Sequence, residues 1–294
     1  MENDRAIVLA EVSKSFGKKQ VLKSITATID RGKSIGLLGE NGVGKTTLFR
    51  ILLDVIAADH GEVRVLGHRP DGTGEIRQRI GYVPEKPAFH SFMTIGEVLK
   101  FRSTVYKGWD SVHVTEYQRL LKLDSATKVS EASKGTLAKL AWICATAHHP
   151  SLLLLDEPTS GLDLLVRESV LLGLIRELSE EGKTIFVANH RMEELMNVID
   201  EIWILANGTI VRRLDTNEIR ASARRITGRL RREIPKDLKI IEEHRSGSVV
   251  SWLTIDKATF AAIQELALLE QMEVSTVPPD VSLRALLKQE EAPE

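Results

Sequence analysis

The sequence contains the segment Gly39-Glu40-Asn41-Gly42-Val43-Gly44-Lys45-Thr46, which follows a short apolar run at residues 34–38 and precedes a helical pattern at residues 46–56. Glycines at these positions let backbone N–H groups wrap around phosphates, because glycine tolerates close approaches and unusual backbone angles. Lys45 supplies positive charge to the outer phosphates, and the Thr46 hydroxyl can ligate Mg²⁺. The helix that follows directs the positive end of its dipole at the anion. We therefore predict a phosphate site for ATP, contacted by Gly39, Glu40, Asn41, Gly42, Val43, Gly44, Lys45, Thr46 and Thr47.

A second motif supplies two carboxylates. The run Leu152-Leu153-Leu154-Leu155-Asp156-Glu157-Pro158 is typical of a buried parallel strand that ends in acids. At the end of such a strand, Asp156 would lie beside the phosphate loop and hold Mg²⁺ through water. Glu157 would polarise an attacking water as general base. The pair of motifs therefore predicts hydrolysis of the bound nucleotide.

The pattern around these motifs alternates short strands with helices, which favours a mostly parallel sheet covered by helices. A mainly helical stretch interrupts the alternation between residues 94 and 149. Strands are expected at residues 6–12, 21–29, 34–38, 62–66, 79–83, 151–156, 184–188 and 202–205, and further helices at residues 165–178 and 192–198.

The character of the sequence changes after Asp215, where arginines cluster before Pro235. We interpret residues 1–215 as one domain, residues 216–235 as a linker, and residues 236–294 as a small α+β domain. In this last domain we expect strands at 249–255 and 273–277 and helices at 257–269 and 283–288. The arginine cluster could face lipid phosphates or be a solvated surface.

The composition excludes several classes of protein. The formal net charge is −1, so no global field draws the chain to nucleic acid or to a membrane. The only cysteine, Cys144, cannot form an internal disulfide, which suits a reducing cytoplasm. The polar start of the chain does not read as a secretory signal. No run approaches the ~20 apolar residues that span a bilayer. If the protein functions at a membrane, we expect another chain to supply the spanning helices.

In order and spacing, these motifs and those between them resemble the ATP-binding-cassette (ABC) ATPases, over roughly residues 6–214. Phe16 is placed where this family stacks an aromatic ring on adenine. Glu85 is placed where most members have the glutamine that senses Mg²⁺ and the γ-phosphate. His190 matches the histidine that contacts the γ-phosphate, and Ser160-Gly161-Leu162-Asp163 matches the loop that contacts a partner cassette. The resemblance thus implies Lys45, Glu157 and His190 as catalytic residues and Thr46, Glu85 and Asp156 as metal-binding residues.

Two departures from the family pattern concern turnover. The signature Leu-Ser-Gly-Gly-Gln is replaced by Ala132-Ser133-Lys134-Gly135-Thr136. Ser133 and Gly135 remain, Lys134 adds a cation, and a helix is expected to follow from Leu137. The N-terminus of that helix could still present N–H groups and Ser133 to a γ-phosphate. Glu85 replaces an amide with a carboxylate that repels phosphate. Both features resemble cassettes paired with exporter-type membrane subunits.

The resemblance implies a P-loop NTPase cassette with a mostly parallel sheet, an N-terminal antiparallel β subdomain and a helical subdomain at about residues 92–149. It implies ATP and Mg²⁺, a second cassette in a homodimer or heterodimer, integral membrane permease subunits, and a place on the cytoplasmic face of the membrane. Phe89, Phe92 and Met93 are candidate contacts for the permease or ordinary core residues. Alternative readings are a soluble cassette that acts on nucleic acid or ribosomes and a weakly active regulatory cassette. The net charge and single phosphate loop argue against the first, and Glu157 and His190 against the second.

Overall fold

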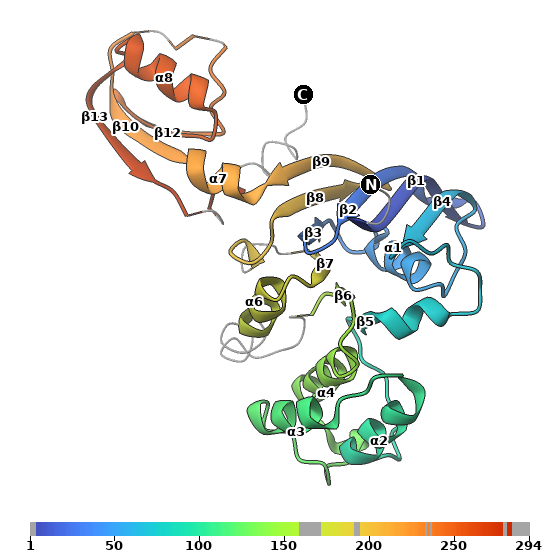
Figure 1. The fold of residues 1–294 in the computed structure, drawn as a ribbon. Helices are drawn as coiled ribbons and strands as arrows, with labels where there is room; N and C mark the ends of the chain where they lie inside the picture. The colour runs from blue at the N-terminus through green and yellow to red at the C-terminus, as the bar shows by residue number, and fades with distance from the viewer. Residues whose placement is uncertain are drawn as a thin grey trace. The chain divides into compact units, whose positions relative to one another are not determined.

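The computed structural model describes residues 4–158, 172–190, 195–232, 234–235, 237–278 and 281–283. The chain forms two compact units, coloured along the sequence in Figure 1. The first comprises Met1–Arg191 and Glu201–Arg213, and the second comprises Met192–Asp200 and Leu214–Glu294.

The first unit begins with an antiparallel sheet in the order β2-β1-β4. Its strands are β1 (Arg5–Phe16), β2 (Lys19–Asp30) and β4 (His60–Val65). In β2, buried residues alternate with exposed ones, so one face packs on the core while the other meets solvent. This sheet confirms the N-terminal antiparallel β subdomain.

A second sheet forms the centre of this unit, in the order β5-β6-β7-β3-β8-β9. β3, β6 and β7 are buried along their whole length, which explains their uninterrupted apolar sequences. Pairing is parallel from β5 through β6, β7 and β3 to β8. The strands are β3 (Ser34–Leu38), β5 (Ile80–Val83), β6 (Leu152–Asp156), β7 (Thr184–Asn189), β8 (Glu201–Ala206) and β9 (Thr209–Asp215).

β9 was not predicted from the sequence. It follows β8 after only Asn207 and Gly208, whose φ angles are 51° and 82°. Two central residues with positive φ are typical of the tight turn that joins antiparallel strands. The Asn-Gly pair is therefore the signal that was missed.

Some helices of this unit lie beside the central sheet and others form a separate group (Figure 1). The helices are α1 (Lys45–Leu52), α2 (Ile95–Val105), α3 (Ser111–Leu120), α4 (Lys134–Thr146) and α6 (Leu172–Glu180), with short 3₁₀ turns at Glu75–Arg79 and Val129–Glu131. α1 was expected to reach residue 56 but ends at Leu52, because the backbone turns at Asp54 with φ 56°. Its apolar face, with Leu48 and Phe49, packs in the core shared with both sheets.

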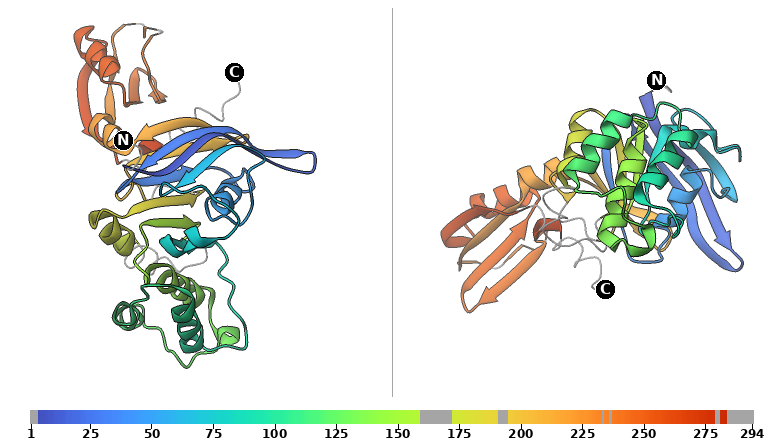
Figure 2. Two further views of the ribbon diagram at one scale, coloured as in Figure 1. Left: turned by 45° about the vertical axis from the view of Figure 1, so that its right-hand side comes forward. Right: turned by 90° about the horizontal axis from the view of Figure 1, so that it is seen from below.

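The stretch expected to be mainly helical is confirmed as α2, α3 and α4. These helices form one group in both views of Figure 2. Each begins at a side-chain cap: Thr94 with Glu97 in a capping box, Asp110, and Ser133. Cys144 is buried in α4, and burial raises the pKa of its thiol to about 12, so we expect it to be unreactive.

The second unit contains an antiparallel sheet in the order β11-β12-β10-β13. Ile226, Trp252 and Ile263 form the centre of its core. The elements are α7 (Thr216–Ser222), β10 (Arg224–Leu230), β11 (Glu242–Ser246), β12 (Val249–Thr254), α8 (Lys257–Glu265) and β13 (Leu269–Thr276). The predicted helix at 257–269 is shorter than expected and the predicted strand at 273–277 is longer. The helix predicted at 283–288 lies almost wholly outside the described residues.

The prediction of a linker over residues 216–235 was wrong. This stretch folds into α7 and into β10, a central strand of the sheet. The arginines concealed the strand pattern, in which Ile226 and Gly228 are buried two residues apart. Within the described parts of the chain, no helix has both the length and the apolar character needed to cross a bilayer.

Candidate functional site

Three parallel strands end at one edge of the central sheet, and the predicted residues follow them there. The phosphate loop begins at Gly39 after β3, Asp156 ends β6, and His190 follows β7. The pairing register aligns Leu38 with Asn189 and Asp156 with Ala188, so these strand ends are level. Crevices at the carboxyl ends of parallel strands are the usual place for ligands in α/β folds.

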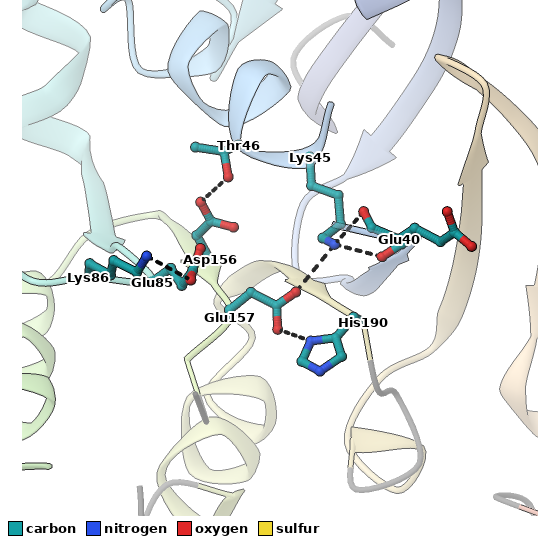
Figure 3. Close-up of polar contacts among 9 residues, drawn as sticks. Glu40, Lys45, Thr46, Glu85, Lys86, Asp156, Glu157 and His190 are labelled. Carbon is teal, nitrogen blue, oxygen red and sulfur yellow. Dashed lines mark hydrogen bonds and ion pairs between the residues drawn. The ribbon is translucent and has the colours of Figure 1, made fainter. Parts of the chain in front are cut away.

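The side chains at this edge contact one another (Figure 3). The Thr46 hydroxyl donates to Asp156 Oδ2 at 2.7 Å. Lys45 Nζ lies 3.3 Å from Glu157 Oε1, and His190 Nδ1 lies 2.6 Å from Glu157 Oε2. Because a carboxylate only accepts hydrogen bonds, the imidazole is the donor in this last contact. The structure thus links the loop, both acids and the histidine.

Lys45 also folds back on its own loop. Its ammonium donates to the carbonyl oxygen of Gly39 at 2.6 Å and to that of Glu40 at 3.2 Å. These are weak partners for a cation compared with phosphate oxygens, since charge-assisted bonds to anions are the stronger class. Lys45 is thus held at the centre of the loop and can exchange these contacts for an anion.

The acids are buried at an electrostatic cost. Asp156 is 1% exposed and Glu157 is 5% exposed. Burial is the main cause that raises the pKa of Asp156 above its ordinary value. Asp156 Oδ1 is buried without a hydrogen-bond partner, whereas Glu157 Oε1 has the ammonium of Lys45 at 3.3 Å as its ion-pair partner. An unsatisfied carboxylate oxygen beside the Thr46 hydroxyl fits a hard cation such as Mg²⁺, which binds one or two carboxylates together with substrate phosphates.

Glycine is required at two positions of the loop. A Cβ atom at Gly39 would lie 2.6 Å from the carbonyl oxygen of Leu205, and one at Gly44 would lie 2.8 Å from Leu22 Cδ2. Gly44 also has φ 123°, a conformation that side chains rarely permit. Gly42 has φ 79° but open space around it. The tight packing at Gly39 and Gly44 holds the loop close to the sheet. Asn41 is exposed, and Val43 and Thr47 are half-buried.

Glu85 lies on the Asp156 side of the cluster (Figure 3). Its side chain is 44% exposed, and Lys86 Nζ lies 3.9 Å from it. Its negative charge contributes to the raised pKa of Asp156. The sequence had not singled out Tyr82, whose pKa is raised by burial and by the nearby Asp156 carboxylate. Tyr82 lies here because β5 pairs with β6, and no local sequence motif indicates that pairing.

Other predicted residues lie apart from this cluster. Phe16 ends β1 and is 51% exposed. Ser133, Lys134 and Gly135 form the start of α4, where Ser133 Oγ accepts a hydrogen bond from the Thr136 N–H at 3.1 Å. α4 lies with α2 and α3 rather than with α1 in Figure 1. Asp163, with Ser160, Gly161 and Leu162, lies outside the described residues.

Comparison with known proteins identifies the family. The ABC transporter family model matches residues 22–160. ABC transporter ATP-binding protein YtrB from Bacillus subtilis is 30% identical over 214 residues, which are 73% of each chain. The chain belongs to the ABC transporter ATP-binding protein family. An uncharacterized member from Methanocaldococcus jannaschii is 35% identical over 70% of this chain and 76% of its own.

Relatives and solved structures agree on this family and fold. Nod factor export ATP-binding protein I from Sinorhizobium fredii is 34% identical over 70% of this chain and 62% of its own. The structure of an ATP binding subunit of an ABC transporter has a TM-score of 0.67 and 26% identity, over 74% of this chain and 92% of that one. A dimeric cassette bound to ADP and Pi shares the fold, with a TM-score of 0.65. The cassette architecture predicted from the sequence is thus confirmed.

Proposed function

We propose that this chain is the ATP-hydrolysing subunit of an ABC transporter, which closes as a dimer on ATP and drives a separate membrane permease. The observation that carries the proposal is the cluster in which the buried Lys45, Asp156 and Glu157 contact one another, Thr46 and the more exposed His190. The buried charges are costly, and Asp156 Oδ1 has no hydrogen-bond partner, as expected of a site that binds a charged substrate.

Each residue of the cluster has a chemical task. The N–H groups of the phosphate loop and Lys45 bind the phosphates of ATP. Thr46 and Asp156 would hold Mg²⁺, which neutralises charge on the transferred phosphoryl group when bound. Glu157 would accept a proton from the attacking water. His190 holds Glu157 Oε2 by its Nδ1–H and leaves Nε2 for the γ-phosphate. Glu85 would reach the metal through water.

The start of α4 supports dimerisation. Ser133 and Lys134 are exposed and Gly135 is half-buried at a helix N-terminus, and they make no described contact with the chain's own phosphate loop. An exposed helix start binds anions well. In a dimer these residues, with Asp163, would meet the nucleotide held by a second cassette, from the same or a different gene. Phe16 would stack on the adenine.

A pocket in the helical group supports binding of a permease. It has a volume of about 230 Å³ and is lined by Ala88, Phe89, His90, Met93, Val98, Phe101 and Arg102. Phe92, also predicted as a contact, does not line the pocket; it is 77% exposed and stacks on His90. Apolar walls with one cation fit an amphipathic helix that carries a carboxylate. We infer that this helix belongs to the permease, which places the cassette on the cytoplasmic face of the membrane.

The export direction rests on the Glu85 and Ser133-Lys134-Gly135 departures, and a relative named for Nod factor export supports it. Affinity purification in mild detergent tests the proposal. A multi-span membrane protein should co-purify with the chain, and Lys45→Ala should abolish ATP binding without unfolding the protein. Co-purification with ribosomes or DNA instead would contradict the proposal, as would ATP binding that survives Lys45→Ala.

A further inference from the structure

The end of β1 departs from regular strand pairing. Against β2, the register shifts between Leu9 and Val12, between Val12 and Lys14, and again between Lys14 and Ser15. Against β4, it shifts between Ala10 and Ser13. Such irregularities leave backbone groups unpaired and redirect side chains. The segment Lys14-Ser15-Phe16 still pairs with β2 through these shifts, and contacts from outside the ladder add to the restraint on its conformation.

Asp59, just before β4, supplies these contacts. Its N–H donates to the carbonyl oxygen of Ser13 at 2.9 Å. Its Oδ2 accepts from the Ser15 N–H at 2.6 Å, and its Oδ1 accepts from Lys14 Nζ at 2.6 Å. One aspartate thus fixes the backbone and a side chain of the same segment, which is 44 positions away in sequence for Ser15.

The Lys14 side chain in turn contacts the ring of Phe16. Its Nζ lies over the ring of Phe16, 5.6 Å from the ring centroid, within the range of a cation–π contact. The Lys14 side chain is 15% exposed, whereas Phe16 is 51% exposed. The ammonium therefore restrains the ring while half of the residue remains available to a ligand.

The charge on Asp59 suits this task. Hydrogen bonds from the Lys14 side chain and the Ser15 N–H hold the pKa of Asp59 below its ordinary value, and His60 acts in the same direction. The carboxylate is thus charged at neutral pH. The Asp59 side chain is 35% exposed at the surface rather than part of the core, so we assign its effect to the orientation of this segment.

We propose that Asp59 is a positioning residue for base binding: through Lys14 and Ser15 it holds the Phe16 ring in the orientation that stacks on the purine of the nucleotide. This inference rests on the proposed ATP function. A ring held in place before binding loses less conformational freedom when a base stacks on it, which favours affinity. Asp59 itself touches no part of the nucleotide.

The test compares two ligands that share phosphates but not a base. The affinities of the full-length protein for the non-hydrolysable analogue AMPPNP and for inorganic tripolyphosphate are each measured by competition with a fluorescent ATP analogue. Asp59→Asn keeps the size of the side chain but removes its charge. We expect AMPPNP to bind about five- to tenfold more weakly, a part of what a base–aromatic stack contributes. Tripolyphosphate should bind with an affinity within about twofold of the unchanged protein, since no stack is involved.

A double mutant cycle separates orientation from general damage. Phe16→Ala should weaken AMPPNP at least as much as Asp59→Asn, and adding Asp59→Asn to Phe16→Ala should cost nothing further. The matched control is Asp71→Asn, another exposed aspartate that caps a backbone N–H, that of Thr73 at 2.9 Å, and that should leave both ligands unaffected.

Three results would overturn the inference: an equal loss for AMPPNP and tripolyphosphate, no loss for AMPPNP, or additive losses in the cycle. If the proposed ATP function itself were wrong, the binding results would differ from these three. In that case the unchanged protein would bind neither ligand, or Lys45→Ala would bind both as well as the unchanged protein does.

Discussion

The two units of the chain bury different kinds of polar groups. In the described part of the first unit, Lys45, Asp156 and Glu157 are each 5% exposed or less. The buried polar side chains described in the second unit are hydroxyls: Thr216, Thr254, Thr259 and Ser282. A hydroxyl is satisfied by one or two backbone groups, whereas a buried carboxylate is expensive unless it is paired. The first unit therefore carries a cost that its fold alone does not explain.

The charged side chains that form ion pairs in the described part of the second unit are half-buried or exposed. Arg225 of β10 pairs with Glu242 of β11 at 3.1 Å, across the intervening β12, and Arg231, just after β10, pairs with Glu270 of the neighbouring β13 at 2.6 Å. These pairs decorate a sheet whose core is apolar. The buried charges of the first unit therefore mark the place of its chemistry, whereas the many arginines of the second unit belong to an ordinary strand and its ends.

Removing one buried charge in the first unit should have the largest effect. Glu157→Gln cannot accept the proton of the attacking water, so we expect ATP hydrolysis to fall on the order of 10²–10⁴-fold. Binding should persist, because Lys45 and the loop are unchanged. The ATPase rate and ATP affinity, measured on the same preparation, check both expectations.

The same variant reports on dimerisation. Because ATP is bound but not hydrolysed, Glu157→Gln should accumulate as a closed dimer with ATP, which light scattering detects. The matched control is Glu131→Gln, an exposed acid one turn before α4. An undiminished ATPase rate in Glu157→Gln would remove the catalytic role from Glu157. A monomer with ATP at high concentration would contradict homodimer closure.

An apolar deletion in the second unit should have a smaller effect, and of another kind. Trp252 is fully buried at the centre of the core of this unit. Trp252→Ala should destabilise the unit by about 3–5 kcal/mol, through lost burial and the cavity that remains. Proteolysis rates in the second unit measure this loss, and ATP affinity should change little.

A conservative variant refines that prediction. The indole Nε1–H of Trp252 is buried without a hydrogen-bond partner. Trp252→Phe removes this unsatisfied donor and keeps most of the volume, so the loss should be less than about 1.5 kcal/mol. A loss of ATP affinity in either variant that matched its loss of stability would show that nucleotide binding depends on the core of the second unit.

The sequence reveals the first unit more fully than the second, for physical reasons. The residues from Gly39 to Thr46 are adjacent in the chain, so their spacing reports the shape of the loop. Asp156 and His190 follow buried parallel strands, whose carboxyl ends meet at one edge. Asp59 escaped notice because its contacts with Lys14 and Ser15 depend on how β4 pairs with β1. No local pattern encodes that pairing.

In the second unit, β10 is an element that its own sequence does not reveal. Its arginines obscure an alternation that carries only Ile226 and Gly228 as fully buried positions. Its place in the sheet depends on pairing with β12 and β13, which come later in the chain. A charged strand of this kind is recognised from its partners, not from its own composition.

The smallest effect is expected from an exposed ion pair in the second unit. Arg231 and Glu270 form a short ion pair, but their side chains are 54% and 48% exposed. Water screens such a pair, so Arg231→Ala should change stability by no more than about 0.5 kcal/mol. Glu270→Gln should have an equally small effect on stability. The double variant should be less stable than either single variant by no more than about 0.5 kcal/mol. Denaturant unfolding of the full chain measures all three. A loss comparable with that of Trp252→Ala would show that surface charge contributes to the fold of the second unit, and the contrast with Lys45 and Glu157 would then no longer separate function from folding.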